Sequence, residues 1–188
     1  MIDFRRSQFL KSAAGPAGFL LDRPQVVFLG RSNVGKSSLI NAICDNSKLM
    51  YVSKTPGRTT TLNYLDLDSK IYLVDAPGYG FASGPDGRFE KLMLDYFREI
   101  RRVFAVVLTD SRRPFTTDDL EVMKLLEQFN VKSVVVLTKS DKLNQKERAA
   151  ALKRVKELFP EEDFIFASVK TRENLPVVKS LICRALSK

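Results

Sequence analysis

The chain has 188 residues, of which 44% are hydrophobic and 28% charged, a balance that fits one folded domain and excludes a chain disordered throughout. Its 31 Lys and Arg against 22 Asp and Glu give a formal charge of +9, which favours an anionic partner larger than a nucleotide: RNA, DNA or a membrane surface. The absence of histidine excludes a histidine base and every histidine-ligated metal site.

Residues 1–24 show no clear periodicity and contain several glycines and prolines, so we expect a lead-in that packs on a core formed by 25–188, all within a single domain spanning 1–188. An apolar run at 26–29 predicts a buried parallel strand that ends at Gly30, and residues 37–44 predict a helix.

Between that strand and that helix, residues 30–37 read Gly-Arg-Ser-Asn-Val-Gly-Lys-Ser, the pattern of a phosphate-binding loop. The two glycines let the backbone curl so that successive N–H groups face an anion, and the helix N-terminus adds to the attraction. We expect Lys36 to reach the β- and γ-phosphates and the Ser37 hydroxyl to bind Mg²⁺. The nucleotide-binding residues expected here are Gly30, Arg31, Ser32, Asn33, Val34, Gly35, Lys36, Ser37 and Ser38.

Residues 45–61 predict a long loop that contains Lys-Thr-Pro-Gly-Arg-Thr-Thr at 54–60. A threonine in such a loop can complete the Mg²⁺ shell through its hydroxyl and sense the γ-phosphate through its backbone. On chemistry alone Thr59, Thr60 and Thr61 all qualify, and Gly57 and Arg58 are expected beside the nucleotide.

Residues 62–68 and 71–75 predict two paired strands, the first of them an exposed edge strand because Tyr64, Asp66 and Asp68 alternate along it. The second ends at Asp75-Ala76-Pro77-Gly78. Asp75 is placed to hold Mg²⁺ through water, and the Gly78 N–H to meet the γ-phosphate. The binding residues expected in this segment are Asp75, Ala76, Pro77 and Gly78.

A second glycine-rich loop is expected at 76–87. Many GTP-hydrolysing proteins orient the attacking water with a glutamine just after this motif, but here the position holds Tyr79, which cannot act in the same way. Tyr79 and Phe81 are either exposed anchors for a partner or aromatic rings folded onto the core.

From here strands and helices alternate, with strands expected at 103–108, 134–137 and 164–167, and helices at 86–102, 117–129, 145–159 and from Leu175 to Leu186. Asn144 and Glu147 have the spacing of a capping box for the third of these helices. The alternation predicts an α/β fold of the P-loop NTPase kind. We expect a mainly parallel sheet with one antiparallel edge strand and helices on both faces.

Thr138-Lys139-Ser140-Asp141 follows the strand at 134–137. The Asp141 carboxylate can accept hydrogen bonds from guanine N1–H and the 2-amino group together, donors that adenine lacks, and the Lys139 stem can lie along the base. At the end of the last strand, Ala167 and Ser168 suit a turn whose backbone N–H meets guanine O6. The residues expected at the base are Thr138, Lys139, Ser140, Asp141, Ala167 and Ser168.

The segments GRSNVGKSSLIN, SKTPGRT, DAPGYG, TKSD and FAS together resemble the EngB family of bacterial GTPases from about Gln25 to the C-terminus. The resemblance selects Thr59 as the second Mg²⁺ ligand beside Ser37 and Asp75, and it implies base contacts from Phe166 to Ser168. It also implies a role in assembly of the large ribosomal subunit and in septation. Ala76 stands where leucine is usual, and Thr138 replaces the usual asparagine, as is common in this family.

Taken together, these features predict Mg²⁺-dependent binding of GTP and GDP with slow hydrolysis, in which Lys36, Thr59 and Gly78 carry the catalysis. Positive charge is also needed to stabilise the negative charge that develops between the β- and γ-phosphates. A partner side chain could supply it, or a K⁺ ion held with the help of Asn33. Alternatively, Asn33 only hydrogen-bonds the loop backbone. Three basic pairs (5–6, 101–102 and 112–113) and a basic helix at 145–159 could each be a solvated surface, but with the net charge they favour RNA as the anionic partner, and the resemblance implies ribosomal RNA.

Three other functions share parts of this pattern. An ATP-dependent kinase or ATPase shares the phosphate loop but has no need of Asp141. A ribosome-binding scaffold would hold GTP without significant turnover. A membrane-associated division GTPase lacks support, since no amphipathic, lipidation or bilayer-spanning segment is found, and no signal peptide is recognised. We therefore expect a cytoplasmic monomer, with Cys44 and Cys183 as reduced thiols.

Overall fold

The computed structural model describes residues 2–50, 61–80, 87–160 and 163–186. The strands of this part of the chain are β1 (Ser7–Ala13), β2 (Gln25–Gly30), β3 (Leu62–Leu67), β4 (Ile71–Asp75), β5 (Val103–Asp110), β6 (Ser133–Thr138) and β7 (Asp163–Phe166). The helices are α1 (Lys36–Ile43), α2 (Arg88–Glu99), α3 (Thr117–Gln128), α4 (Gln145–Leu158) and α5 (Leu175–Leu186), with short 3₁₀ turns at Pro16–Gly18 and Ser140–Lys142.

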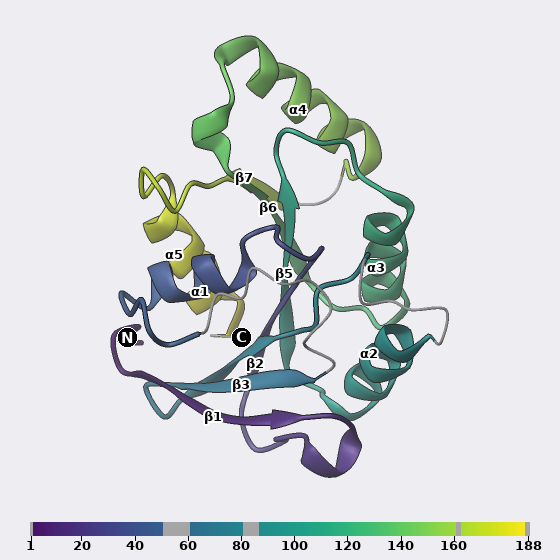
Figure 1. Ribbon diagram of the computed structural model, residues 1–188. Coiled ribbons are helices and arrows are strands. Elements are labelled where there is room, and N and C mark those ends of the chain that lie inside the picture. Colours follow the sequence, from purple (N-terminus) through teal and green to yellow (C-terminus); the bar gives the residue numbers. More distant parts are fainter. Residues whose placement is uncertain (1, 51–60, 81–86, 161–162, 187–188) are drawn as a thin grey trace.

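The strands form one sheet in the order β1-β3-β4-β2-β5-β6-β7 (Figure 1). The neighbours from β4 through β7 pair in parallel, whereas β3 pairs antiparallel with both β4 and β1. The expected α/β class with a mainly parallel sheet and a single antiparallel strand is therefore confirmed.

The edge of the sheet differs from the prediction. Residues 7–13, expected to be part of a lead-in, form β1 and cover β3, so β3 lies one strand in from the edge. Tyr64, Asp66 and Asp68 are buried, and Arg23 forms an ion pair with Asp66 at 2.8 Å. The sequence of β1 does not predict a strand, because its apolar residues Phe9 and Leu10 are adjacent and do not alternate with polar ones, and both are exposed in the structure. The pairing also slips between Phe9 and Lys11, which marks a bulge.

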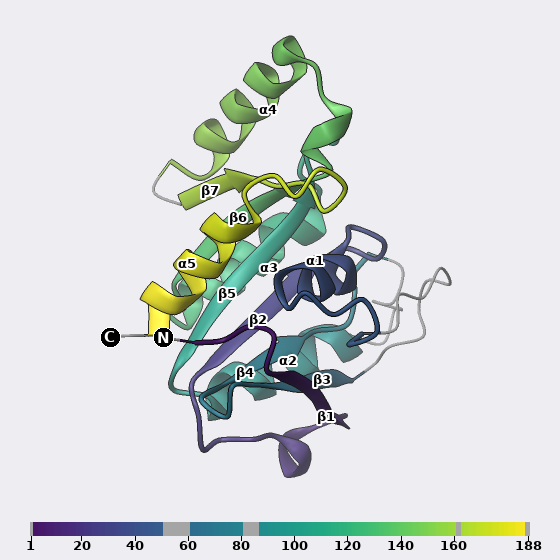
Figure 2. The ribbon, with the colours of Figure 1, turned by 90° about the vertical axis from the view of Figure 1, so that its left-hand side faces the viewer.

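Helices cover both faces of the sheet, as expected (Figures 1 and 2). Side chains of α1 and α5, such as Ile40 and Val178, pack with alternate strand residues such as Val26 on one face. Side chains of α2, α3 and α4 pack on the other face with the intervening residues, such as Val27. Every residue of β2 is buried, which explains why residues 26–29 form a continuous apolar run and not an alternating pattern.

Among the described residues, two helices begin with the hydrogen-bonding pattern of a capping box. The predicted one at Asn144 and Glu147 opens α4, and a second, formed by Thr116 and Asp119, opens α3. No helix among the described residues is long and apolar enough to cross a membrane. Cys44 is buried and Cys183 partly buried, and the two are not joined in a disulfide.

Candidate nucleotide-binding site

The phosphate-binding loop predicted from the sequence connects β2 to the first turn of α1. Gly35 precedes α1 with φ of 113°, a left-handed conformation that suits glycine, and as the N-cap residue it has no side chain to cap the helix, so the first N–H groups of α1 can bind an anion. Lys36 is buried, and its Nζ donates a hydrogen bond to the Gly30 carbonyl at 3.1 Å. Burial lowers the pKa of Lys36 and the nearby Asp75 carboxylate opposes that shift. A phosphate group would supply the ammonium with a stronger partner.

Ser37 and Asp75, two of the three expected Mg²⁺ ligands, lie together: the Ser37 hydroxyl donates to Asp75 Oδ2 at 3.4 Å. Asp75 Oδ1 is buried with no hydrogen-bond partner among the described residues, and burial raises the pKa of this carboxyl to about 6. A hard divalent cation would satisfy that orphan oxygen, so the two residues fit Mg²⁺. The third expected ligand, Thr59, lies outside the described residues, as do Gly57, Arg58 and Thr60; Thr61 immediately precedes β3.

The segment after Asp75 is packed against the phosphate loop. A Cβ on Gly78 would lie 2.8 Å from Ser32 Cα and 2.9 Å from Ser32 N, so only glycine fits there. The Ser32 N–H donates to the Tyr79 carbonyl at 3.1 Å, and the Ser32 hydroxyl to the Gly78 carbonyl at 3.3 Å. The predicted γ-phosphate sensor therefore lies directly over the phosphate loop. Ala76 is buried, and Pro77 continues the loop between it and Gly78.

Tyr79 is an aromatic ring folded inward, one of the two alternatives left open by the sequence. It is 1% exposed, and its hydroxyl donates to Asp119 Oδ1 at 2.7 Å. Phe81 lies outside the described residues.

A cavity of about 330 Å³ lies beside the phosphate loop where the base would bind. Three loops distant in sequence form it: the loop before α1, the segment after β6 and the turn after β7. Its lining residues are Val34, Gly35, Ser38, Leu39, Thr138, Lys139, Asp141, Lys142, Ala167, Val169 and Lys170. The structure thus brings together the phosphate loop and both predicted base-binding segments.

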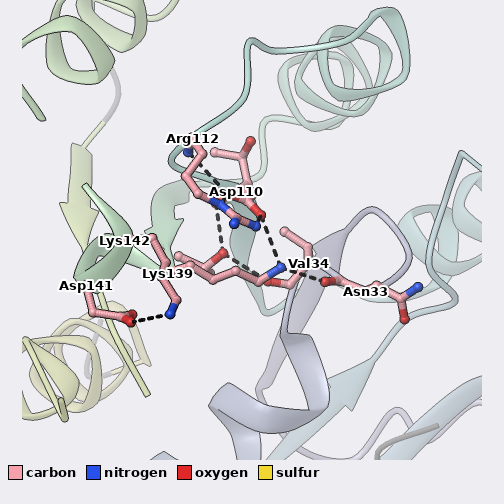
Figure 3. Close-up of polar contacts among 9 residues, drawn as sticks. Asn33, Val34, Asp110, Arg112, Lys139, Asp141 and Lys142 are labelled. Atoms are coloured by element: carbon pink, nitrogen blue, oxygen red, sulfur yellow. Dashed lines mark hydrogen bonds and ion pairs between the residues drawn. The ribbon is translucent and has the colours of Figure 1, made fainter. Parts of the chain in front are cut away.

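Asp141 is held in place within this cavity. The Ser168 hydroxyl donates to Asp141 Oδ1 at 2.7 Å, and this hydrogen bond lowers the pKa of Asp141, so the carboxylate is an acceptor at neutral pH. Its second oxygen lies 3.9 Å from Lys142 Nζ (Figure 3). An ionised acceptor at the wall of the cavity is what recognition of the guanine N1–H and 2-amino donors requires.

Thr138 and Lys139 tie this segment to the phosphate loop, and Figure 3 shows Lys139 beside Asn33 and Asp110. The Thr138 hydroxyl bonds the Val34 carbonyl at 2.9 Å, a link across loops that needs only a short donor side chain. Lys139 Nζ donates to the Asn33 carbonyl at 3.0 Å and to Asp110 Oδ2 at 3.1 Å. Lys139 therefore lines one wall of the cavity, and a stem lying along the base stays a prediction.

The base pocket contains residues that the sequence did not single out. Val169 and Lys170 line it together with the predicted Ala167, whereas the predicted Phe166 and Ser168 are not among its lining residues. Phe166 instead carries the Arg148 guanidinium 5.2 Å from its ring centroid. The lining residues of the base pocket thus lie further toward the C-terminus than predicted, and this follows from the geometry of the turn after β7.

Arg148 and Glu173 form a second feature that the sequence did not indicate. Arg148 of α4 binds both carboxylate oxygens of Glu173, at 2.8 and 2.6 Å. Glu173 also accepts from the fully buried Ser140 hydroxyl at 2.6 Å, and its carbonyl accepts from the Ser168 N–H at 3.2 Å. The Arg148–Glu173 pair therefore braces both base-binding segments from behind, a relation between residues too far apart for any local pattern to show.

Comparison with known proteins agrees with this geometry. Residues 25–139 match the family described as "50S ribosome-binding GTPase". A probable GTP-binding protein EngB from Solibacter usitatus is 43% identical over 157 residues, covering 81% of this chain and 82% of the relative. The corresponding protein from Syntrophotalea carbinolica is 37% identical over 99% of this chain and 93% of its own length. A crystal structure of a probable GTP-binding protein engB shares the fold, with a TM-score of 0.67 at 24% identity, covering 87% of this chain and 98% of that one.

The fold and the family match define a P-loop GTPase that binds GTP and GDP. Within that class, the chain belongs to the EngB family of GTP-binding proteins, as the sequence motifs predicted.

Proposed function

We propose that this protein is a slow, Mg²⁺-dependent GTPase switch that acts in assembly of the large ribosomal subunit. The match of residues 25–139 to a family described as 50S ribosome-binding carries the proposal, and the net charge of +9 supports an RNA-rich partner. By family resemblance, normal septation depends on the same activity. In this proposal the chain acts as a single domain and a cytoplasmic monomer.

Slow hydrolysis follows from the residues around the γ-phosphate position. Tyr79, at the position of the usual glutamine, is buried and its hydroxyl donates to Asp119, so it is not available to orient a water. Lys36 and the Gly78 N–H, with Thr59 on Mg²⁺, would stabilise charge in the transition state, and Mg²⁺ would neutralise the phosphate oxygens. The remaining positive charge would come from a ribosomal side chain or from K⁺ near Asn33.

Cosedimentation with purified large ribosomal subunits tests the proposed function. We expect stronger association with a non-hydrolysable GTP analogue than with GDP, and a steep loss of binding as salt rises, because Lys and Arg release counterions from RNA. Equal association in both nucleotide states would remove the switch from the proposal, and no association would remove the ribosomal partner.

A scaffold that holds GTP without significant turnover is the second candidate, favoured by the same buried Tyr79. Single-turnover hydrolysis with and without ribosomal subunits separates the two. The switch requires faster hydrolysis with the subunits, whereas a scaffold requires an unchanged, negligible rate.

A further inference from the structure

A groove with a volume of about 530 Å³ runs between α2 and α3 and is separate from the base and phosphate sites. The two helices lie side by side on the same face of the sheet (Figure 1). The apolar part of the groove consists of Phe89 and Leu94 from α2 and Val122 and Leu125 from α3. A surface hollow with an apolar floor between two helices is the shape that receives an apolar side chain or an amphipathic segment of another protein.

The charge of the groove is opposite to that of the protein. Glu90, Asp118 and Glu121 line it against one cation, Lys124, in a chain whose formal charge is +9. None of the three carboxylates makes an ion pair with any described residue. Asp118 shares the end of the groove near Gly80 with the Arg31 guanidinium, which leaves Glu90 and Glu121 as the exposed, unpaired anions.

This combination selects the chemistry of the occupant. Carboxylates around an apolar floor attract Lys and Arg side chains and repel the phosphates of RNA. The basic surfaces elsewhere on the chain have the opposite preference. We propose that the α2–α3 groove docks a Lys- and Arg-rich amphipathic segment of a ribosomal protein, which makes it a protein-binding site and not part of an RNA-binding surface. This assignment rests on the proposed ribosomal function.

The position of the groove links docking to the nucleotide. Tyr79 and Gly80 form one wall, directly after Gly78. The Tyr79 carbonyl accepts the N–H of Ser32 in the phosphate loop at 3.1 Å. A segment that presses on this wall acts on the residue beside the predicted γ-phosphate sensor, so docking and nucleotide state bias each other reciprocally.

The test reverses the groove charge with the double variant Glu90→Lys and Glu121→Lys. Both side chains are exposed, so the fold should tolerate the change. The matched control is Glu99→Lys with Glu127→Lys, which makes the same charge change on exposed residues of the same two helices outside the groove. Binding to purified large ribosomal subunits is measured by cosedimentation in the GTP-analogue state.

We expect the groove variant to bind about tenfold or more weakly than wild type, while the control, with the same added positive charge, binds equally or more tightly. If the groove variant binds as well as the control, the groove does not receive a basic segment. Tighter binding of the groove variant than of the control would mean that the groove faces RNA, and it overturns the proposal in the same way.

A second measurement tests the docking site independently of the ribosomal subunits. It still applies if wild type fails to bind subunits, an outcome that would overturn the proposed function. The probe is a fluorescent helical peptide with Leu on one face and Lys on the other, compared with a Leu/Glu peptide of equal length. We expect the Leu/Lys peptide to bind wild type about tenfold more tightly than the groove variant, and the Leu/Glu peptide not to bind wild type. Equal binding of the Leu/Lys peptide to wild type and groove variant would overturn the docking site itself.

Discussion

The Tyr79 hydroxyl and Asp119 Oδ1 are 2.7 Å apart, and both side chains are buried. The other carboxylate oxygen of Asp119 accepts from the backbone N–H and the hydroxyl of Thr116, at 2.8 and 2.9 Å, where α3 begins. The loop that follows β4 is therefore tied to the first turn of α3. Burial, together with the neighbouring Asp119 charge, holds the pKa of Tyr79 well above its ordinary value, so the phenol keeps its proton and remains a donor.

Tyr79→Phe should lower the free energy of unfolding by about 1–2 kcal/mol, because Asp119 loses a buried donor. The rate of GTP hydrolysis should stay within about twofold, since the hydroxyl is engaged inside the protein. Urea unfolding and single-turnover hydrolysis measure the two effects. Tyr96→Phe is a matched control, because it removes another buried hydroxyl, one that donates to Gln25 at 3.0 Å. A tenfold loss of rate in Tyr79→Phe alone would give the hydroxyl a part in catalysis.

Asp141→Asn should change the preferred base from guanine to xanthine. Xanthine carries a 2-oxo group where guanine has the 2-amino group, so it needs a donor where guanine needs an acceptor. Competition between GTP and XTP for the purified variant measures the change. Ser168→Ala should weaken GTP binding and leave the guanine preference intact, because it removes the hydrogen bond that orients Asp141, together with the one from the Thr171 N–H, but keeps the Asp141 carboxylate. A variant Asp141→Asn that still prefers GTP would show that another residue reads the base.

Arg148→Ala should raise the dissociation constants of GTP and GDP by a similar factor, about tenfold, because the brace behind both base-binding segments is lost. The rate of the chemical step should not change, since Arg148 lies away from the phosphates. Lys146→Ala, an exposed change on the same helix, is the control. The exchange Arg148→Glu with Glu173→Arg should restore part of the affinity. An Arg148→Ala variant with wild-type affinity for both nucleotides would limit the pair to a stabilising contact.

Asp75 gives a pH dependence of stability in the protein stripped of nucleotide and Mg²⁺. Its folded pKa of about 6 lies above the value of about 3.9 for an unfolded chain. The stability contributed by this group is therefore fully present below about pH 4 and is lost as the pH rises through about 6. At pH 7.5, Asp75→Asn should be more stable than wild type by roughly 2–3 kcal/mol, and at pH 4 the advantage should vanish.

Urea unfolding with chelator present measures this difference across the pH range. Adding Mg²⁺ and nucleotide should reverse the order at pH 7.5, because the charged carboxylate holds the cation more strongly than the neutral amide of asparagine. A stability difference that does not vary with pH would mean that Asp75 is not protonated near pH 6.

A variant of Asn33 can show whether K⁺ or a partner side chain supplies the additional positive charge for GTP hydrolysis. Its side chain is exposed and makes no hydrogen bond to the described residues, although its backbone carbonyl accepts from Lys139. If its amide oxygen helps to hold K⁺, wild type should hydrolyse GTP faster in K⁺ than in Na⁺ at matched ionic strength, and Asn33→Ala should lose that difference. Equal rates in both salts with ribosomal subunits present would favour a partner side chain.

The sequence predicted the central sheet well. Its five parallel strands appear as apolar runs, and each is followed by a loop or helix that its own sequence pattern predicts. The sequence did not predict β1, because Phe9 and Leu10 are adjacent and exposed and so give no alternating pattern. This strand forms through its pairing with β3. The phosphate loop, Asp75 and Asp141 were recognisable because their spacing follows from the chemistry of one nucleotide. The brace of Arg148 and Glu173 was not, since it arises only when α4 and the turn after β7 are packed together.

The bulge in β1 has a consequence for the behaviour of the protein at high concentration. An outermost strand presents unpaired backbone groups on which a strand of another molecule can grow. Here the register slips between Phe9 and Lys11, and the charged Lys11 is exposed on the same strand. A regular ladder cannot continue across that break, and an incoming chain would have to bury an ammonium group. The strand that completes the sheet is thus poorly suited to seed aggregation, although two of its exposed side chains are apolar.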